Sequence, residues 1–258
     1  MEDAEYFALE ALSASGAKLL KKSPLHYYAD RQKPRSPTPA MVFGTVVHRL
    51  ALEPEKPAFA VKRLNWASKE GKAEKAELEA TGLPILSEAD GDRALAIRDM
   101  LWRDAQIAEL LKGAETEVAM TWEQHGVRCK AKADAINGEY LLDLKTCIDA
   151  SPRGFQRAVA EFSYWLQSAW YLDGYEATRG KPALDFLFIA VESQSPHAVG
   201  VYRLDHAAIS AGRREMKRMA ALYADCLKTN RWPGYSRATT TLSVPSWAMP
   251  ADEWIEAA

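Results

Sequence analysis

Residues 115–146 read ETEVAMTWEQHGVRCKAKADAINGEYLLDLKT, and apolar and polar side chains alternate through most of this stretch. Strict alternation is typical of β-strands that turn one face to the core and the other to polar surroundings. It occurs in three consecutive runs, which begin near Glu117, Val127 and Tyr140. The stretch therefore predicts an antiparallel meander of three strands.

The second turn of this meander has a clear hairpin signal. Asn137-Gly138 favours a two-residue loop, because both residue types tolerate positive φ. In this register Ile136 and Glu139 flank the loop. Asp134 then lies diagonal to Asp143 on the next strand, and the two carboxylates share one face within reach of a common ion.

The first turn of the meander is less well defined. A four-residue loop over 123–126 puts Glu117 opposite Lys132. A loop that is one residue longer or shorter turns Glu117 to the other face. In the first case one face carries Glu117, Lys132, Asp134, Asp143 and Lys145. A polar sheet face is most often only solvated. Carboxylates beside lysines also suit metal-dependent hydrolysis of a phosphodiester, since carboxylates bind hard divalent cations and a lysine can steady the attacking water.

Composition narrows the range of protein classes. The chain has 258 residues, 48% of them hydrophobic, and a net charge of −2, so a nucleic-acid partner requires a local basic patch. Cys129, Cys147 and Cys226 are isolated, and zinc or iron–sulfur ligation by cysteine is not expected. We find no signal peptide and no apolar run of membrane length, and we expect a cytoplasmic protein without membrane contact.

Helical patterns flank the meander on both sides. The expected elements are helices over 41–52, 69–80, 88–113, 152–176 and 206–229, and strands over 184–191 and 199–204. Phe162 is expected on the buried side of the helix over 152–176. In the first of these helices His48 follows Gly44 by one turn; a lone histidine beside an apolar stripe is more often a core residue than a ligand. Gln167 and Tyr171 are four residues apart and share a helix face.

Together these segments resemble the PD-(D/E)XK nuclease superfamily, and within it the RecE-type exonucleases (exonuclease VIII) of phages and prophages. The resemblance rests on LSASGAKLLKKSP at Leu12–Pro24, FGTVVHRLALEP at Phe43–Pro54, Glu117, Asp134, the triplet Asp143-Leu144-Lys145, and Gln167-Ser-Ala-Trp-Tyr171. It implies an α/β fold in which helices flank a central mixed sheet that contains the antiparallel meander. We expect one nuclease domain, with a mainly helical part over 1–114, a catalytic core over 115–204, and a C-terminal helix and tail over 205–258.

The resemblance also implies roles for individual residues. The metal, Mg²⁺ or a substituting Mn²⁺, would be bound by His48, Asp134, Asp143 and the backbone carbonyl of Leu144, with Glu117 available for a second ion. Lys145 would position the attacking water, and Gln167 and Tyr171 would order this lysine or the scissile phosphate. The candidates for DNA binding are Ser15, Lys18, Lys21, Lys22, Arg213, Arg214, Lys217 and Arg218, although such basic clusters are usually only solvated.

The implied activity is degradation of linear double-stranded DNA from the 5′ end, which leaves 3′ single-stranded overhangs. Members of this family form rings around DNA, here expected to be a tetramer or trimer, and work beside a single-strand annealing recombinase. A Cas4-like or RecB-like nuclease of another pathway is the rival enzyme, but Cas4-like enzymes need cluster-binding cysteines. Two other candidates are not enzymes. One is a non-catalytic DNA-binding relative, and the other is a structural protein whose polar sheet face is solvated.

Overall fold

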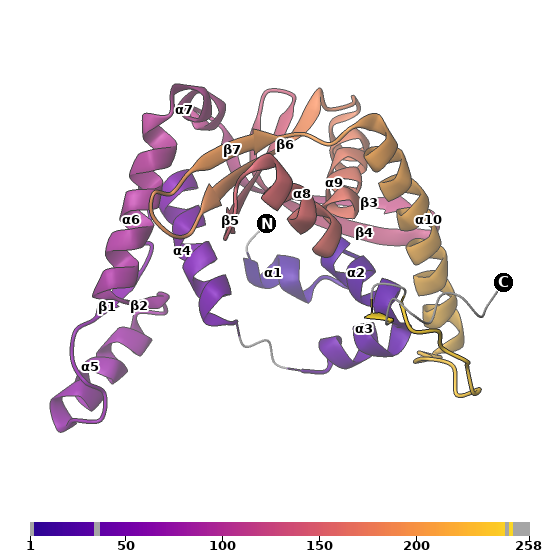
Figure 1. The fold of residues 1–258 in the computed structure, drawn as a ribbon, viewed down its shortest axis with the longest axis horizontal. Coiled ribbons are helices and arrows are strands. Elements are labelled where there is room, and N and C mark those ends of the chain that lie inside the picture. The colour runs from indigo at the N-terminus through magenta and orange to yellow at the C-terminus, as the bar shows by residue number, and fades with distance from the viewer. Residues whose placement is uncertain (1–2, 34–36, 246–247, 250–258) are drawn as a thin grey trace.

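The computed structural model describes residues 3–33, 37–245 and 248–249, and its centre is a five-stranded sheet (Figure 1). The elements before the sheet are α1 (Asp3–Ala8), α2 (Ala14–Lys22), α3 (Pro24–Arg31), α4 (Pro39–Leu52), β1 (Ala60–Lys62), α5 (Lys69–Ala80), β2 (Ile85–Ser87), α6 (Glu88–Arg103) and α7 (Ala105–Leu111). The remaining elements are β3 (Glu115–Gln124), β4 (Val127–Asn137), β5 (Tyr140–Cys147), α8 (Pro152–Glu161), α9 (Tyr164–Arg179), β6 (Asp185–Glu192), β7 (Val199–Tyr202) and α10 (His206–Thr229).

The sheet has the order β3-β4-β5-β6-β7 and contains both kinds of strand pairing. The meander β3-β4-β5 is antiparallel, β6 runs parallel to β5, and β7 is antiparallel to β6. The helices α8 and α9 form the crossover that a parallel pair requires. The expectation of an α/β fold with a mixed sheet and an antiparallel meander is therefore confirmed.

Both hairpin loops differ from the expected ones by two residues in register. Asn137 pairs with Tyr140, so the second loop is Gly138-Glu139 and the positive φ belongs to Gly138. The first loop has two residues, not four, because Gln124 pairs with Val127. A shift of two residues preserves the face on which each side chain lies. The expected sharing of a face between the two meander carboxylates survives for this reason.

The ladder between β4 and β5 is short, and beyond it the strands separate. Their pairing runs only from Asn137 opposite Tyr140 to Ala135 opposite Leu142. Further along β4, the segment before α2 takes the place of β5: Leu12 N–H donates to Arg128 O at 2.9 Å, and Lys130 N–H donates to Leu12 O at 2.8 Å. The sheet is thus split on one side of the hairpin.

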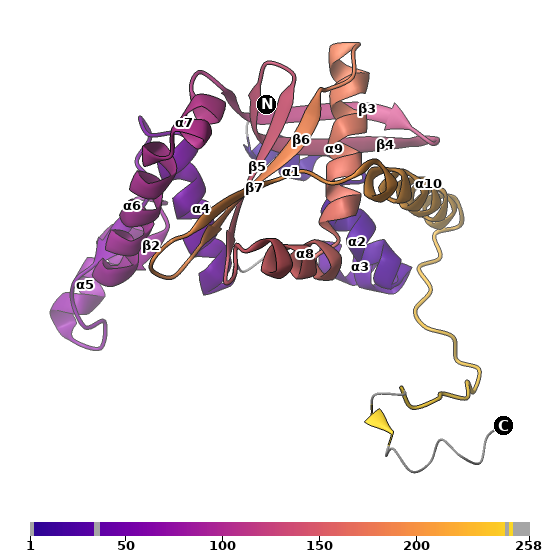
Figure 2. The same cartoon turned by 45° about the horizontal axis from the view of Figure 1, so that its top comes forward.

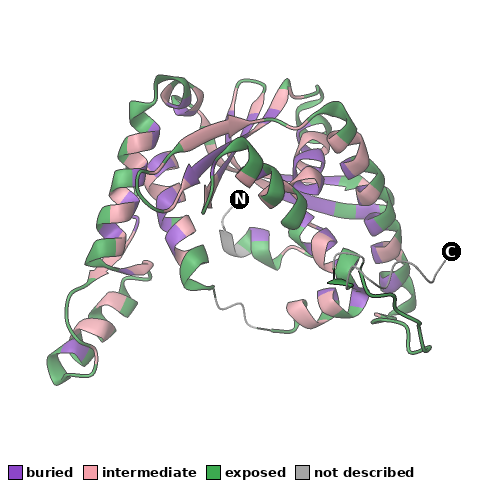
Figure 3. Ribbon diagram, in the orientation of Figure 1, coloured by how far each residue is buried: buried purple, intermediate pink, exposed green. Residues whose placement is uncertain are grey.

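Helices cover both faces of the sheet (Figure 2). One buried cluster joins the sheet to α2, α9 and α10 and includes Trp170, Phe186 and Phe188. The other joins it to α4 and α6 and includes Val47 and Ile97. In Figure 3 buried residues follow the strands and the inward faces of these helices. The helices consequently cover part of the predicted polar face, and its charged residues are half-buried or buried.

Two helices that we expected to be continuous are each broken in two. The helix expected over 88–113 ends at Arg103, and Asp104 begins α7 by accepting the N–H groups of Gln106 and Ile107 at 3.0 Å. The helix expected over 152–176 breaks where Ser163 has a φ of 51°. Phe162, expected to be buried, lies at this break and is 51% exposed. Each break turns the chain, so an apolar pattern that continues through it does not report one helix.

The remaining expected elements are present with small changes at their ends. The helix over 69–80 and that over 206–229 have the expected bounds, and Asp205 caps the latter by accepting the N–H of Ala208 at 2.7 Å. The unit of β1, β2 and α5 lies at the N-terminal end of α6, and α5 extends beyond that end (Figure 1). None of the described helices is both long and apolar enough to cross a membrane.

Candidate active site

The split between β4 and β5 brings Asp134 to the centre of the molecule. Because the two strands have separated, the backbone N–H of Leu144 has no ladder partner on β4, and it donates to Asp134 Oδ2 at 2.9 Å. The carboxylate therefore lies against the backbone of the Asp143-Leu144-Lys145 triplet. The opening in the sheet also allows helices from both faces to reach one place.

The helix α4 brings His48 to this opening from one side. Thr38 caps α4 by accepting the N–H of Met41, and Val46 and Val47 are fully buried against the sheet. These contacts hold His48 at the edge of the buried face, where its Nδ1 lies 3.5 Å from Asp134 Oδ2. The histidine that sequence alone favours as a core residue is thus 24% exposed beside an acid.

Gly44 lies one turn before His48 and lines the same cavity. A side-chain carbon added at Gly44 would lie 3.4 Å from Thr146 Oγ1. A glycine within a helix costs roughly 1 kcal/mol relative to alanine. The close approach of α4 to the end of β5 gives a reason for its presence.

The second side of the opening is formed by α9, which brings Gln167 to Asp143. The side chain of Asp143 is only 2% exposed. Its Oδ1 accepts a hydrogen bond from Gln167 Nε2 at 2.6 Å, and its Oδ2 lies 2.5 Å from Lys145 Nζ. A buried carboxylate is costly unless it is paired in this way. The Asp-x-Lys triplet and the expected glutamine of α9 therefore form one contact network.

The charges of this network change the proton affinities of its members. Burial raises the pKa of Asp134 to about 6; His48 opposes the shift and the charge of Asp143 adds to it. Burial would lower the pKa of Lys145, but Asp143 and Asp134 outweigh that effect, and the pKa lies above its ordinary value. Burial, with the two acids, also raises the pKa of Tyr171 well above its ordinary range. Lys145 is thus held as a cation, and Tyr171 stays a neutral phenol.

Glu117 and Lys132 complete one wall of the site. They form an ion pair, and Glu117 has a φ of 55°, an uncommon conformation for a residue other than glycine. Both line a cavity of about 1270 Å³ together with His48, Asp134 and Lys145. Four of the five residues expected on the polar sheet face line this cavity, and the fifth, Asp143, lies buried behind Lys145.

A second cavity of about 850 Å³ adjoins the first along Lys132 and is lined also by Gln167 and Tyr171. Of the residues expected to bind DNA, Ser15 and Lys18 line it. Burial, and secondarily the charge of Lys145, lower the pKa of Lys18 to about 8. Lys18 is therefore part of the site and not merely a solvated residue of its helix.

The other basic residues expected to bind DNA lie farther along the surface. Lys21 stacks on Trp165, with Nζ 4.7 Å from the ring centroid. Arg218 is paired with Glu215 at 2.6 Å, and the pKa of Glu215 is lowered by Arg218 and also by Lys21. The helices α2 and α10 pack together, so their basic residues lie on neighbouring elements. The remaining basic residues expected to bind DNA on α2 and α10 are exposed; they are Lys22, Arg214 and Lys217.

Arg213 lies apart from the rest of this cluster. Its Nε lies 2.7 Å from Asp173 Oδ1, and it lines a separate hollow beside Trp122.

Sequence reasoning missed Tyr164, which begins α9. The Nζ atoms of Lys18 and Lys145 each lie 5.2 Å from the centroid of its ring. A ring at this distance attracts both cations and orders them. Its position three residues before Gln167 could have indicated that it shares a helix face with the site, had the helix start been recognised.

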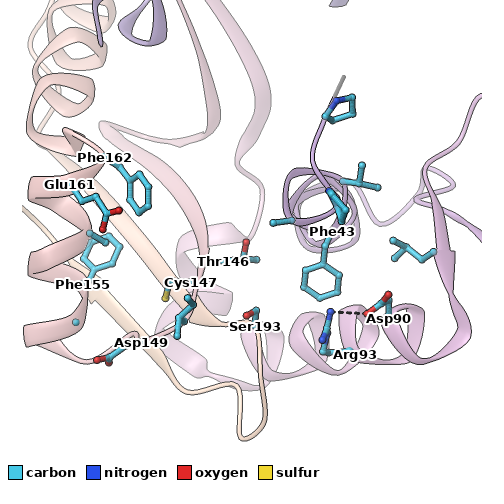
Figure 4. Close-up of a pocket in the computed structure, with 18 of the residues that line it drawn as sticks. Phe43, Asp90, Arg93, Thr146, Cys147, Asp149, Phe155, Glu161, Phe162 and Ser193 are labelled. Atoms are coloured by element: carbon cyan, nitrogen blue, oxygen red, sulfur yellow. Dashed lines mark hydrogen bonds and ion pairs between the residues drawn. The ribbon is translucent and has the colours of Figure 1, made fainter. Parts of the chain in front are cut away.

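A third cavity, of about 880 Å³, lies on the other side of Thr146 (Figure 4). Phe43, Phe155 and Phe162 contribute apolar walls, and Arg93 is paired with Asp90 at its edge. The predicted metal-binding and catalytic residues, all within the described part of the chain, lie outside its lining. We assign the chemistry to the two cavities that adjoin the paired carboxylates and lysines.

The donor atoms at the split suit a divalent cation, although they are not gathered around one point. Within residues 3–33, 37–245 and 248–249, no three His, Cys, Asp or Glu side chains are close enough together to chelate an ion as they stand. Asp134 and Asp143 are near enough for the charge of one to raise the pKa of the other. Two carboxylates and an imidazole are ligands that Mg²⁺ and Mn²⁺ accept.

A mixed sheet flanked by helices, with two acids and a lysine two residues after the second, is consistent with the PD-(D/E)XK class of fold. Residues 13–242 match the family described as PDDEXK-like domain of unknown function (DUF3799), and the chain belongs to this family. Families of this class generally use divalent metals.

The fold is also similar to that of a protein from Eubacterium rectale described as a presumed exonuclease. Its crystal structure has a TM-score of 0.68 and 17% sequence identity, and the match covers 95% of each chain. The crystal structure of SSO0001 matches 70% of this chain and 84% of its own at 15% identity, but its TM-score of 0.31 supports no comparison. No curated protein matches the chain significantly.

Proposed function

We propose that this protein is a metal-dependent deoxyribonuclease that degrades linear double-stranded DNA from its ends. The observation that carries the proposal is the contact of Lys145 with buried Asp143, beside Asp134 and in a cavity rimmed by further lysines. Such an arrangement combines ligands for a cation with a fixed positive charge near the reacting phosphate. The matched family and the fold of the presumed exonuclease support the same class of activity.

Asp134, Asp143, His48 and the Leu144 carbonyl are the proposed metal ligands, with Mg²⁺ as the natural ion and Mn²⁺ as its substitute. When bound, the ion would polarise the phosphate and lower the pKa of a water molecule. The backbone N–H of Leu144 orients Asp134, and Gln167 orients Asp143. Glu117 is our candidate for a second ion, although Lys132 pairs with it in the present structure.

Lys145 has the central chemical role in this proposal. Its ammonium group is kept protonated by the acids and is ordered by the ring of Tyr164. It can hold the attacking water and stabilise the negative charge that develops on the phosphate. Tyr171, a neutral phenol, can donate a hydrogen bond to a phosphate oxygen from the α9 side.

The DNA backbone would follow the basic residues that lead away from the site. Ser15 and Lys18 line the adjoining cavity, and Lys21, Lys22, Arg214, Lys217 and Arg218 extend the basic surface along α2 and α10. Arg213 is paired with Asp173, and to contact the DNA backbone it would exchange this carboxylate for a phosphate.

The finer features of the activity rest on the resemblance to RecE-type exonucleases. We place the reaction as 5′ to 3′ degradation that leaves 3′ overhangs, which a single-strand annealing recombinase could use. A ring-shaped tetramer or trimer would admit an end and reject continuous duplex. Light scattering, with and without DNA, tests the assembly separately from the chemistry.

The activity is tested with linear duplex DNA labelled at one or the other 5′ end or at one 3′ end, with and without Mg²⁺. We expect Mg²⁺-dependent release of 5′-terminal nucleotides, no digestion of covalently closed circles, and a large loss of activity in Lys145→Ala. The matched control is Lys181→Ala, which removes an exposed lysine paired with Glu139. Digestion of closed circles as fast as linear DNA would contradict end specificity, and equal activity of Lys145→Ala would contradict the assigned site.

A further inference from the structure

The short helix α1 lies between α4 and α2 (Figure 1). Its residue Phe7 lines both the cavity that contains His48 and the cavity that contains Lys18. The side chain is 60% exposed, although it is a large apolar group. An exposed ring between two cavities is available to contact whatever occupies them.

A buried lysine holds the end of α1 that carries Phe7. Lys130 of β4 is 6% exposed, and its Nζ donates to Tyr6 O at 2.7 Å and to Leu9 O at 2.8 Å. The same Nζ lies 4.8 Å from the centroid of the Tyr6 ring. The carbonyls that Lys130 binds flank Phe7 in the chain. A buried charge is expensive without partners, so these contacts fix the position of Phe7 relative to β4.

Cations lie on both sides of Phe7. Lys132 lines both cavities, Lys145 and Arg49 line the first, and Lys18 lines the second. Proteins that hold a nucleic-acid strand commonly combine cations, which follow the phosphates, with aromatic rings on which bases stack. The same combination is found here within the two adjoining cavities.

We propose that Phe7 stacks on a nucleobase of the strand that enters these cavities, and that Lys130 is the residue that positions it. This inference rests on the proposed nuclease function and adds a contact to the base, beyond the contacts to phosphate and metal. The occupant is a single nucleobase, because Phe7 is the exposed ring that lines both cavities, while the ring of Tyr6 packs edge-on against it at 5.5 Å and is buried. If α1 instead blocked the cavities, removal of the Phe7 ring would strengthen DNA binding or speed digestion.

The test measures stacking directly and does not require cleavage. Duplex DNA with a short 5′ single-stranded end that contains 2-aminopurine, whose fluorescence falls on stacking, is titrated with full-length protein in EDTA. We expect quenching by the wild type and by Phe7→Trp. For Phe7→Ala we expect loss of quenching and an increase in Kd of at least about fivefold, the lower end of the range for one base stacked on an aromatic ring. Tyr235→Ala, an exposed aromatic residue beside His26, is the matched control and should behave as the wild type.

Lys130→Met tests the positioning role. If Lys130 acts through Phe7, its replacement should reduce quenching in the wild-type background and have no further effect on Kd in the Phe7→Ala background. Additive effects of the two changes would refute the positioning role, whatever the stability of the single variants.

The outcomes separate this inference from the proposed function. If the wild type digests linear DNA but Phe7→Ala quenches as the wild type does, the stacking inference is wrong and the nuclease stands. Tighter binding or faster digestion by Phe7→Ala would show that α1 is a plug. If the wild type binds no DNA end at all, the proposed function fails, and the stacking inference fails with it.

Discussion

Two of the polar networks that connect the sheet of this protein to α9 differ in how their charges are balanced. In the first, Trp122 Nε1 donates to Gln124 Oε1 at 2.8 Å, and Gln124 Nε2 donates to Asp173 Oδ2 at 2.8 Å. Arg213 Nε completes it by donating to Asp173 Oδ1 at 2.7 Å. One acid meets one base, next to the end of β3 that is paired with β4, and the network serves to hold α9 and α10 against the sheet.

The second network lies at the split between β4 and β5 and contains two carboxylates. Its lysine forms an ion pair with only one of them. Asp143 is buried with Lys145 and Gln167, whereas Asp134 has a backbone N–H and a histidine 3.5 Å away. The pKa of Asp134 rises to about 6 as a result of burial and of its neighbour. The comparison indicates where to expect a cation and a substrate: beside a cavity, where buried carboxylates outnumber the cationic side chains that pair with them.

The largest expected difference between the networks follows removal of Lys145. Lys145→Ala should lower the turnover of linear duplex by at least about 100-fold, the scale seen when one electrostatic contact to a transition state is lost. Arg213→Ala removes a cation of the balanced network and, at saturating DNA, should leave the rate near that of the wild type. The rates are compared under single-turnover conditions with protein whose fold is verified by circular dichroism. Similar losses in both variants would remove the distinction between the two networks.

A smaller effect is expected for the two glutamines. Gln167→Ala removes a hydrogen bond to the buried Asp143 carboxylate, and such bonds contribute about 1.5–3 kcal/mol, or roughly 10- to 100-fold in rate if the acid must be held in place. Gln124→Ala should lower the melting temperature and leave the single-turnover rate unchanged. A rate unaffected by Gln167→Ala would show that Asp143 needs no support from α9.

The pH dependence of DNA binding tests Lys18. Burial and Lys145 lower its pKa to about 8, so the amine is charged below that pH and loses its proton as the pH rises through it. The slope of log Kd against log salt concentration should therefore decrease in magnitude by up to about 0.9 between pH 7 and pH 9, the contribution of one phosphate contact. Lys18→Arg should abolish this change because arginine stays charged, and Lys18→Ala should show the shallow slope at both pH values. Unchanged slopes would place Lys18 away from phosphate.

The smallest effect is expected for the ion pair of the balanced network. Arg213 is 47% exposed, and a pair with this exposure contributes at most about 1 kcal/mol to the free energy of unfolding. A double-mutant cycle with Asp173→Ala and Arg213→Ala in urea unfolding measures it. A coupling several times larger would mean that the pair is more important to the fold than its exposure suggests.

Much of the site could be predicted because alternation in a strand keeps each side chain on its face when the register shifts by two residues. Asp134 and Asp143 stay on the expected face even though both hairpin loops are shifted by two residues. The position of His48 on a helix was also predictable from the apolar stripe of 41–52.

Other features depend on long-range contacts that leave no local pattern. The split of the sheet arises because Leu12, more than 100 residues away, pairs with β4 in place of β5. The break between α8 and α9 depends on the left-handed conformation of Ser163, which is not a residue type that favours it. The helix α1 has six residues, too few for a periodic signal, and the role of Lys130 in holding it follows only from tertiary structure.

The central claim is that the acids at the split are the reaction centre. It is tested most directly by the rate at which end-labelled linear duplex is digested in Mg²⁺ by Asp143→Asn and Asp173→Asn, two matched changes in the two networks. We predict that Asp143→Asn loses digestion, because the carboxylate beside Lys145 is neutralised, and that Asp173→Asn digests at nearly the wild-type rate. Wild-type digestion by Asp143→Asn, with the protein folded, would contradict the assignment of the active site.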